Sequence, residues 1–100
     1  MAITSKQRAY LRGLANNIEP IFQIGKNGLT PEVTEAIDEA LEKRELLKIT
    51  LLNNCDEDIK EVGSILHERT QSELVQIIGK RIVLYRASKK NPKIELPKKK

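Results

Sequence analysis

The sequence predicts an α/β protein with the element order α-β-α-β-α-β-β and a small four-stranded mixed sheet. Apolar residues recur at helical spacing in three segments, and the shorter apolar segments around them are typical of strands. Strands that are separated by helices favour parallel pairing through right-handed crossovers. Only Gly79-Lys80 separates the last two strands, which fits a two-residue hairpin turn, so that pair must be antiparallel.

The first helix is expected to begin with Ser5 as its N-cap and to end near Asn16. Its apolar residues at helical spacing are Tyr10, Leu11, Leu14 and Ala15. Its polar side carries the three cations Lys6, Arg8 and Arg12. After Pro20, the segment Ile21–Ile24 predicts a short strand.

The second helix has the clearest start signal in the chain. Thr30 is a good N-cap, Pro31 suits the first helical position, and Glu32 favours the positive end of the helix dipole. The helix is expected to stop near Lys43–Arg44, because cations suit a helix C-terminus. Its apolar stripe is Val33, Ala36, Ile37, Ala40 and Leu41, and its solvated side is Glu35, Asp38, Glu39 and Glu42.

The segment Glu45–Leu52 predicts a second strand, with Leu47, Ile49 and Leu51 on one face. Asp56, in the turn that follows, is expected to cap a third helix that ends near Arg69. The inward residues of this helix are predicted to be Ile59, Val62, Ile65 and Leu66. The hairpin strands are predicted at Glu73–Ile78 and Arg81–Arg86.

The second and third helices each have one apolar stripe, so both are expected to cover the same face of the sheet. The first helix is expected at the edge or side of the sheet. Residues 1–86 are predicted to form one domain, followed by a basic, largely extended tail over residues 87–100. The tail has little apolar material to bury, so its removal is expected to leave stability almost unchanged.

Charge is distributed unevenly along the chain, whose formal net charge is +4. Residues 1–30 carry four Lys or Arg and one acid, which gives +3. Residues 31–70 carry five Lys or Arg and eleven acids, which gives −6. Residues 71–100 carry nine Lys or Arg and two acids, which gives +7. The fold can therefore place a basic face opposite an acidic one, and a basic face usually indicates a polyanionic partner.

Several function classes lack the residues that they would need. Cys55 is the only cysteine, so no intramolecular disulfide or cysteine metal cage can form, and His67 has no second ligand nearby. Asp56, Glu57 and Asp58 precede a helix and are explained by its dipole, so no catalytic residue, metal or cofactor is predicted. No apolar run approaches membrane-spanning length and no secretory signal is visible, so the expected setting is the cytoplasm.

The segment Gly25-Lys26-Asn27-Gly28 joins a predicted strand to a helix N-terminus. The glycines allow close approach of a ligand, while the helix dipole and Lys26 favour an anion such as phosphate. The loop is too short for a nucleotide-triphosphate loop and lacks the dinucleotide-binding pattern. A Gly-x-x-Gly loop clamps the nucleic-acid backbone in KH domains. Taken alone, the four residues fit either a phosphate site or a simple tight turn.

The ordered segments IGKNGLTPEV, ELLKITLL and QIIGKRIVLYR resemble the CRM domain, named for chloroplast RNA splicing and ribosome maturation. The similarity is to its small single-domain bacterial members, the YhbY-like proteins, and extends from SKQRAYLRGLA through VLYR. It implies a fold similar to the C-terminal domain of translation initiation factor three. It also implies RNA binding through Gly25, Lys26, Asn27 and Gly28, and association with the precursor of the large ribosomal subunit.

Basic residues outside the loop are expected to extend an RNA-binding surface. The candidates are Lys6 and Arg12 on the first helix and Lys80, Arg81 and Arg86 on the hairpin, together with the lysines of the tail. The hairpin cations fit solvated surface charges equally well. Phe22 and Tyr85 are expected to pack in the core or on the sheet. Two other functions stay open, namely a module that binds acidic proteins and an enzyme acting on a small phosphate compound.

Overall fold

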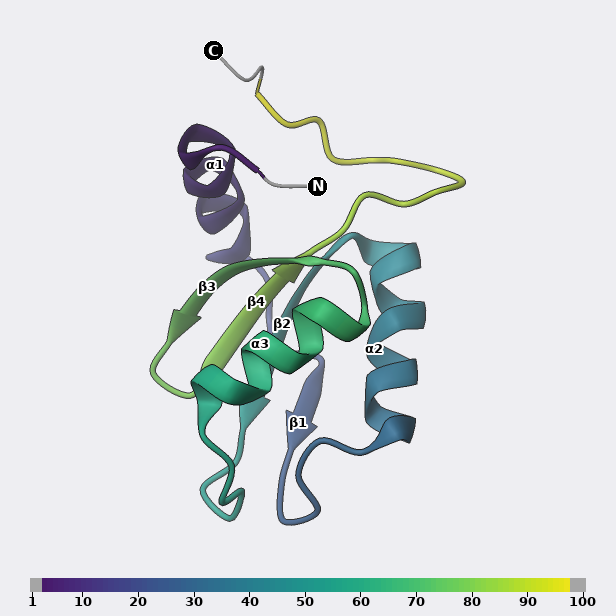
Figure 1. Ribbon diagram of the computed structural model, residues 1–100. Coiled ribbons are helices and arrows are strands. Elements are labelled where there is room, and N and C mark those ends of the chain that lie inside the picture. The colour runs from purple at the N-terminus through teal and green to yellow at the C-terminus, as the bar shows by residue number, and fades with distance from the viewer. Residues whose placement is uncertain (1–2, 98–100) are drawn as a thin grey trace.

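The protein has the predicted order of helices and strands (Figure 1). The structure is a computed structural model that describes residues 3–97. Its helices are α1 (Ser5–Ala15), α2 (Pro31–Arg44) and α3 (Ile59–Arg69). Its strands are β1 (Phe22–Ile24), β2 (Leu46–Leu51), β3 (Glu73–Ile78) and β4 (Arg81–Tyr85). None of the helices in this described part of the chain has the length and apolar character that crossing a membrane requires.

The strands form one mixed sheet in the order β1-β2-β4-β3, which confirms the predicted fold class. β1 and β2 are parallel and are connected through α2, whereas β4 is antiparallel to both of its neighbours. The β3–β4 turn is the predicted one, since Gly79 has a φ of 56° and Ile78 pairs with Arg81. The register of β3 shifts between Leu74 and Gln76, which marks a β-bulge.

α2 and α3 cover the same face of the sheet, as predicted. Their inward residues, Ile37, Leu41, Val62 and Leu66, share one buried cluster with Leu47, Ile49, Ile82 and Leu84 of the sheet. α1 covers the opposite face, where Leu11 and Ala15 pack with Leu46, Val75, Val83 and Tyr85. The sheet therefore separates two apolar cores. The alternation of side chains along β2 and β4 supplies residues to both of them.

Two of the predicted helix starts are wrong. Thr4, not Ser5, is the N-cap of α1, because its hydroxyl accepts the N–H of Gln7 while the Gln7 side chain accepts the N–H of Thr4. This reciprocal capping box selects Thr4 over its neighbour. α3 begins after Asp58 rather than after Asp56, and the Asp58 side chain makes no capping hydrogen bond.

Two residues predicted on apolar helix faces are exposed instead. The exposed fraction is 43% for Tyr10 and 37% for Ile65. Each lies beside a leucine, Leu11 or Leu66, that is fully buried. Adjacent helical positions are about 100° apart, so a helix that contacts the sheet through a narrow stripe buries only one of the two.

The C-terminal segment, residues 87–97, contains no helix or strand (Figure 1), but several side-chain contacts and hydrogen bonds fix it to the domain. Ile94 and Leu96 pack against the α1-side core, and the Gln7 side-chain amide donates to the carbonyl of Pro97 at 2.9 Å. The expectation that this segment has little apolar material to bury is therefore wrong. The three terminal lysines, which were expected to add to RNA binding, lie outside the described residues.

Glu45 organises the C-terminal segment from a buried position between α2 and β2. Its side chain is fully buried, and its φ of 67° is unusual for a residue other than glycine. Burial alone would raise the pKa of its carboxyl, but hydrogen bonds from the N–H groups of Ser88, Lys93 and Ile94 lower the pKa below its ordinary value. Burial and then the nearby Glu45 charge raise the pKa of Tyr85.

Candidate nucleic-acid interface

The glycine loop, residues Gly25–Gly28, connects β1 to α2 as a tight turn. The N–H of Gly28 donates to the carbonyl of Gly25 at 2.9 Å, and Gly28 has a φ of 67°, which explains the second glycine. α2 then begins as predicted, with the Thr30 hydroxyl accepting the N–H of Val33 at 3.2 Å. Lys26 and Asn27 form the exposed tip of the loop.

Glu57 occupies part of the corner that the sequence suggested for an anion. Its carboxylate accepts the N–H of Leu29 at 2.7 Å and covers Gly28, so that a Cβ on Gly28 would lie 1.8 Å from Glu57 Oε1. A carboxylate of the protein itself therefore uses one donor beside the helix N-terminus. The sequence explains Glu57 only through the dipole of α3. No local pattern indicates its contact with a loop 28 residues away.

The glycine loop lies at the same end of the molecule as the β3–β4 hairpin. The N–H of Leu52 donates to Ile24 just before the loop, and the N–H of Leu51 donates to Lys80 in the hairpin, both at 2.8 Å. Asn54 approaches Gly25 from the β2–α3 connection. Three segments that are distant in sequence thus meet here, and they bring Lys80 and Arg81, both exposed, to the same end as Lys26.

Lys6 and Arg12 are both exposed, but they lie toward the other end of the α1 side of the sheet. α1 packs beside Tyr85 at the end of β4, whereas Arg81 is its first residue. A strand rises about 3.3 Å per residue, so the two ends of β4 are about 13 Å apart. Arg8, the third cation of α1, donates instead to the carbonyls of Leu74 and Val75.

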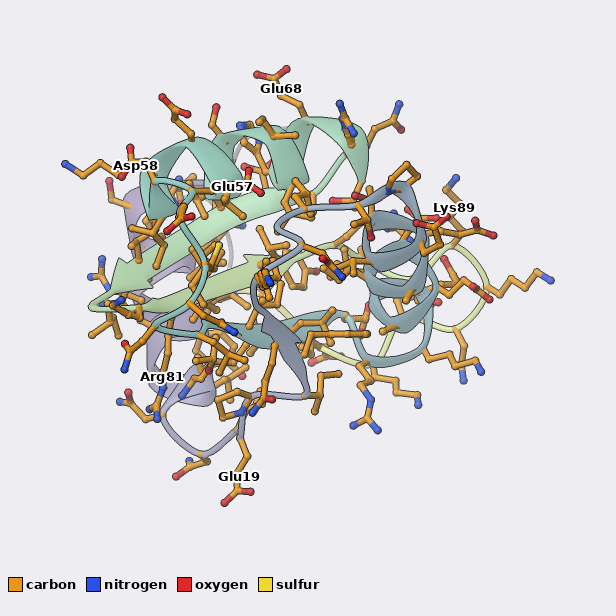
Figure 2. All side chains as sticks on the ribbon, turned by 90° about the horizontal axis from the view of Figure 1, so that it is seen from below. Glu19, Glu57, Asp58, Glu68, Arg81 and Lys89 are labelled. Carbon is orange, nitrogen blue, oxygen red and sulfur yellow. The ribbon has the colours of Figure 1, made fainter. Side chains whose placement is uncertain are left out.

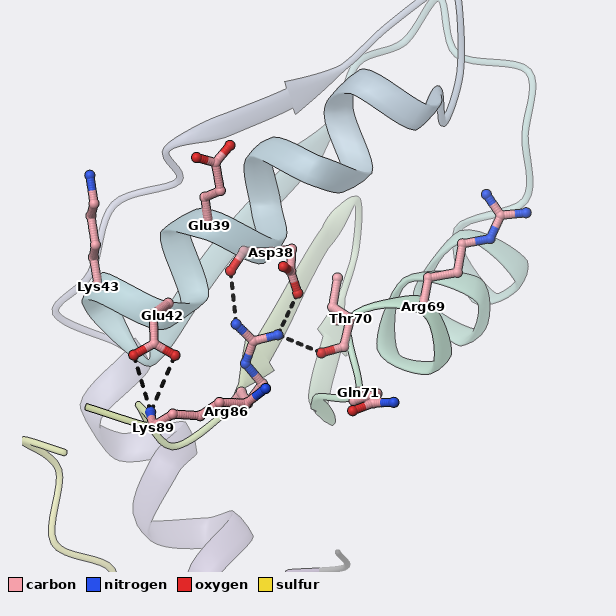
Figure 3. Close-up of a pocket in the computed structure, with 9 residues that line it drawn as sticks. All are labelled: Asp38, Glu39, Glu42, Lys43, Arg69, Thr70, Gln71, Arg86 and Lys89. Atoms are coloured by element: carbon pink, nitrogen blue, oxygen red, sulfur yellow. Dashed lines mark hydrogen bonds and ion pairs between the residues drawn. The ribbon is translucent and has the colours of Figure 1, made fainter. Parts of the chain in front are cut away.

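Arg86 is held inside the fold and is not brought to the glycine loop (Figure 3). Its guanidinium donates to the Asp38 carboxylate at 2.5 Å, to the Asp38 carbonyl at 2.9 Å and to the Thr70 carbonyl at 2.6 Å. Its side chain is only 15% exposed. A phosphate contact would compete with these bonds, which favours a structural role for Arg86 over the predicted role in RNA binding.

The depression around Arg86 is lined by carboxylates as well as by the cations Lys43, Arg69, Arg86 and Lys89. It has a volume of about 410 Å³ and includes the carboxylates of Asp38, Glu39 and Glu42 (Figure 3). Glu42 accepts the N–H groups of Lys89 and Lys90 and the hydroxyl of Ser88. The Ser88 hydroxyl, followed by the Lys89 N–H, lowers the pKa of the Glu42 carboxyl. This region therefore serves to hold the C-terminal segment.

The two faces of the sheet carry helices of different charge. α2 has five acidic residues and two cations, whereas α1 has three cations and no acid. Figure 2 shows Glu57 and Asp58 on the α3 side of the sheet and Arg81 on the opposite side. A polyanion is thus favoured on the side of α1 and the hairpin.

Among residues 3–97, no three His, Cys, Asp or Glu side chains are grouped as metal ligands.

Comparison with known proteins identifies the fold. The family model described as the CRS1 / YhbY (CRM) domain matches residues 3–86. The chain belongs to this CRM domain family. The predicted family resemblance is therefore confirmed, and the match covers all the secondary structure described above.

Two curated proteins and one solved structure are similar to this chain over nearly its whole length. A Bacillus subtilis protein named "Probable RNA-binding protein YqeI" is 48% identical over 95 residues, which are 95% of this chain and 99% of that one. A Haemophilus influenzae protein named "RNA-binding protein" is 38% identical over 99 residues, with 97% of each chain covered. The solution structure of Staphylococcus aureus SAV1595 matches with a TM-score of 0.80 and 54% identity, covering 96% of this chain and 100% of that one.

Proposed function

We propose that this CRM domain binds RNA through the glycine loop, Gly25–Gly28, and the neighbouring hairpin residues Lys80 and Arg81. The observation that carries the proposal is the meeting of Lys26, Lys80 and Arg81 at one end of the fold. All three are exposed, and none of their side chains has a hydrogen-bond or ion-pair partner within residues 3–97. Cations without internal partners are free to neutralise phosphates.

The mode of action in this proposal is binding rather than catalysis. The loop tip contributes Lys26 and Asn27, which suit the sugar-phosphate backbone because one is a cation and the other carries both a donor and an acceptor. Lys6 and Arg12 are additional contacts for a longer RNA, since they lie on the same side of the sheet as Arg81. Backbone contacts of this kind supply affinity and orientation, while the shape of the folded RNA supplies specificity.

The RNA in this proposal is ribosomal RNA in a precursor of the large ribosomal subunit, bound in the cytoplasm. Support comes from the resemblance to the single-domain YhbY-like members of the family and from the relatives whose names describe RNA-binding proteins. In this proposal the protein acts as an assembly factor by binding the precursor particle.

The test is sedimentation of a cell lysate through a sucrose gradient, followed by sequencing of RNA crosslinked to the protein. We expect the protein to migrate with large-subunit precursors and to crosslink to their RNA. Lys26→Ala should move it toward the top of the gradient, whereas Lys60→Ala, which removes an exposed cation from α3, should not. Migration with free proteins only, without crosslinked ribosomal RNA, would overturn the proposal and favour an acidic protein partner.

A further inference from the structure

A depression lies beside the glycine loop on the α1 side of the sheet. It has a volume of about 440 Å³ and is lined by residues from the end of β2 and from the hairpin. Thr50 faces this side because its two neighbours in β2, Ile49 and Leu51, both enter the opposite core, and side chains alternate along a strand. Leu52, which also lines the depression, lies next to Gly25 and so connects it to the glycine loop.

The lining of the depression combines apolar and cationic groups. Ile78 is 49% exposed and Leu52 is 37% exposed, which makes them two of the few large apolar side chains that the described fold leaves in solvent. Lys80 and Arg81 also line this depression, as do the polar residues Thr50 and Asn53. An apolar surface bordered by cations suits a ligand that has a flat apolar ring and negative charges beside it.

The charges around the glycine loop favour one path for the backbone of a bound RNA. On the α3 side, Asp56, Glu57 and Asp58 are all exposed and would repel a phosphate, and Glu57 already accepts the N–H of Leu29. On the hairpin side, the free cations are Lys80 and Arg81. A backbone held at Lys26 is therefore favoured to continue toward the hairpin, which takes it past the depression.

We infer that the depression receives an unpaired RNA base, with Ile78 and Leu52 against its ring and the flanking phosphates on Lys26 and on Lys80 or Arg81. The inference rests on the proposed RNA-binding function and adds the class of RNA that the site prefers. Bases within a duplex are stacked and paired, whereas those of loops and bulges can turn outward into a protein. Thr50 and Asn53 offer hydrogen-bonding groups for the edge of the base.

The test compares the full chain on two RNAs that differ by one unpaired uridine, a fully paired stem made of two separate strands and the same stem with a single bulged uridine. We expect the bulged RNA to bind about fivefold more tightly, the effect of covering roughly 40 Å² of apolar surface. With 4-thiouridine at the bulge, crosslinks should map to residues 50–53 or 78–81. Equal affinity for the two RNAs, or crosslinks confined to other segments, would overturn the inference.

A pair of variants separates this inference from RNA binding in general. Ile78→Ser should remove the preference for the bulged RNA and leave affinity for the paired stem unchanged. Ile65→Ser is the matched control, because Ile65 is a similarly exposed isoleucine on α3. A preference that survives Ile78→Ser would overturn the inference while leaving the proposed function intact. Failure of the unmodified protein to bind either RNA would overturn both.

Discussion

The carboxylate of Glu45 accepts the backbone N–H of Ile94 at 2.8 Å and so joins the end of α2 to a segment 49 residues later. The same oxygen accepts the N–H of Lys93 at 2.7 Å, and the other oxygen accepts that of Ser88 at 2.8 Å. One buried side chain thus positions the C-terminal segment over the α1-side core. The C-terminal segment is consequently part of the folded domain rather than a free extension of it.

Replacing Glu45 by glutamine should destabilise the protein by about 2 kcal/mol, because an amide nitrogen then faces backbone N–H groups that lose their acceptor. Chemical denaturation followed by circular dichroism measures the change. Glu39→Gln is the matched control, since Glu39 lies exposed on the same helix. Equal stability of the two variants would show that the three hydrogen bonds contribute little.

Stability should depend on pH through the same contacts. The pKa values of Glu42 and Glu45 are both lowered in the folded protein, so their stabilisation is complete above the ordinary value of 4.5 and is lost as pH falls through the lowered values. Denaturation curves between about pH 6 and about pH 3 should therefore show a declining free energy of unfolding. Glu45→Gln should show a smaller decline, and an unchanged decline would contradict the assignment.

Ile94→Ala should lower the melting temperature, because Ile94 packs on the α1-side core. The side chain is only partly buried, so a loss of about 1–2 kcal/mol is expected, less than for a fully buried isoleucine. Thermal denaturation of the Ile94→Ala variant measures this loss of stability. Lys90→Ala, an exposed change in the same segment, should leave the melting temperature unaltered.

Ile37→Ala should destabilise by about 2–5 kcal/mol, since Ile37 is fully buried between α2 and the sheet. Ile65→Ala should cost far less, because that side chain is exposed. Urea denaturation of both variants measures the difference. Similar losses for the two would contradict the placement of α2 and α3 on the sheet.

Lys26→Ala should weaken RNA binding by about 1 kcal/mol and reduce the salt slope by about one phosphate contact, with no change in stability. Lys60→Ala should change neither quantity. Filter binding over a range of salt concentrations gives both. Gly28 is a poorer probe than Lys26, because any side chain there meets Glu57 and the positive φ of Gly28 adds strain.

Local patterns in the sequence were sufficient to predict the elements and one face of the sheet. Thr30 and Pro31 define the start of α2, and Gly79 defines the hairpin, through interactions with residues close by. The roles of Glu45 and Glu57 could not be predicted in this way. Their partners are backbone N–H groups far along the chain, and such groups are the same at every residue, so the sequence carries no sign of which one is bound.

The bulge in β3 has a consequence for self-association. β3 is an outer strand of the sheet, and an outer strand presents unpaired backbone groups on which another chain can add a strand. The irregularity between Leu74 and Gln76 interrupts that row, and Arg8 occupies the carbonyls of Leu74 and Val75. The opposite outer strand, β1, is only three residues long. Both margins of the sheet are thereby poor templates for fibril growth, so the fold itself disfavours strand addition by a second copy.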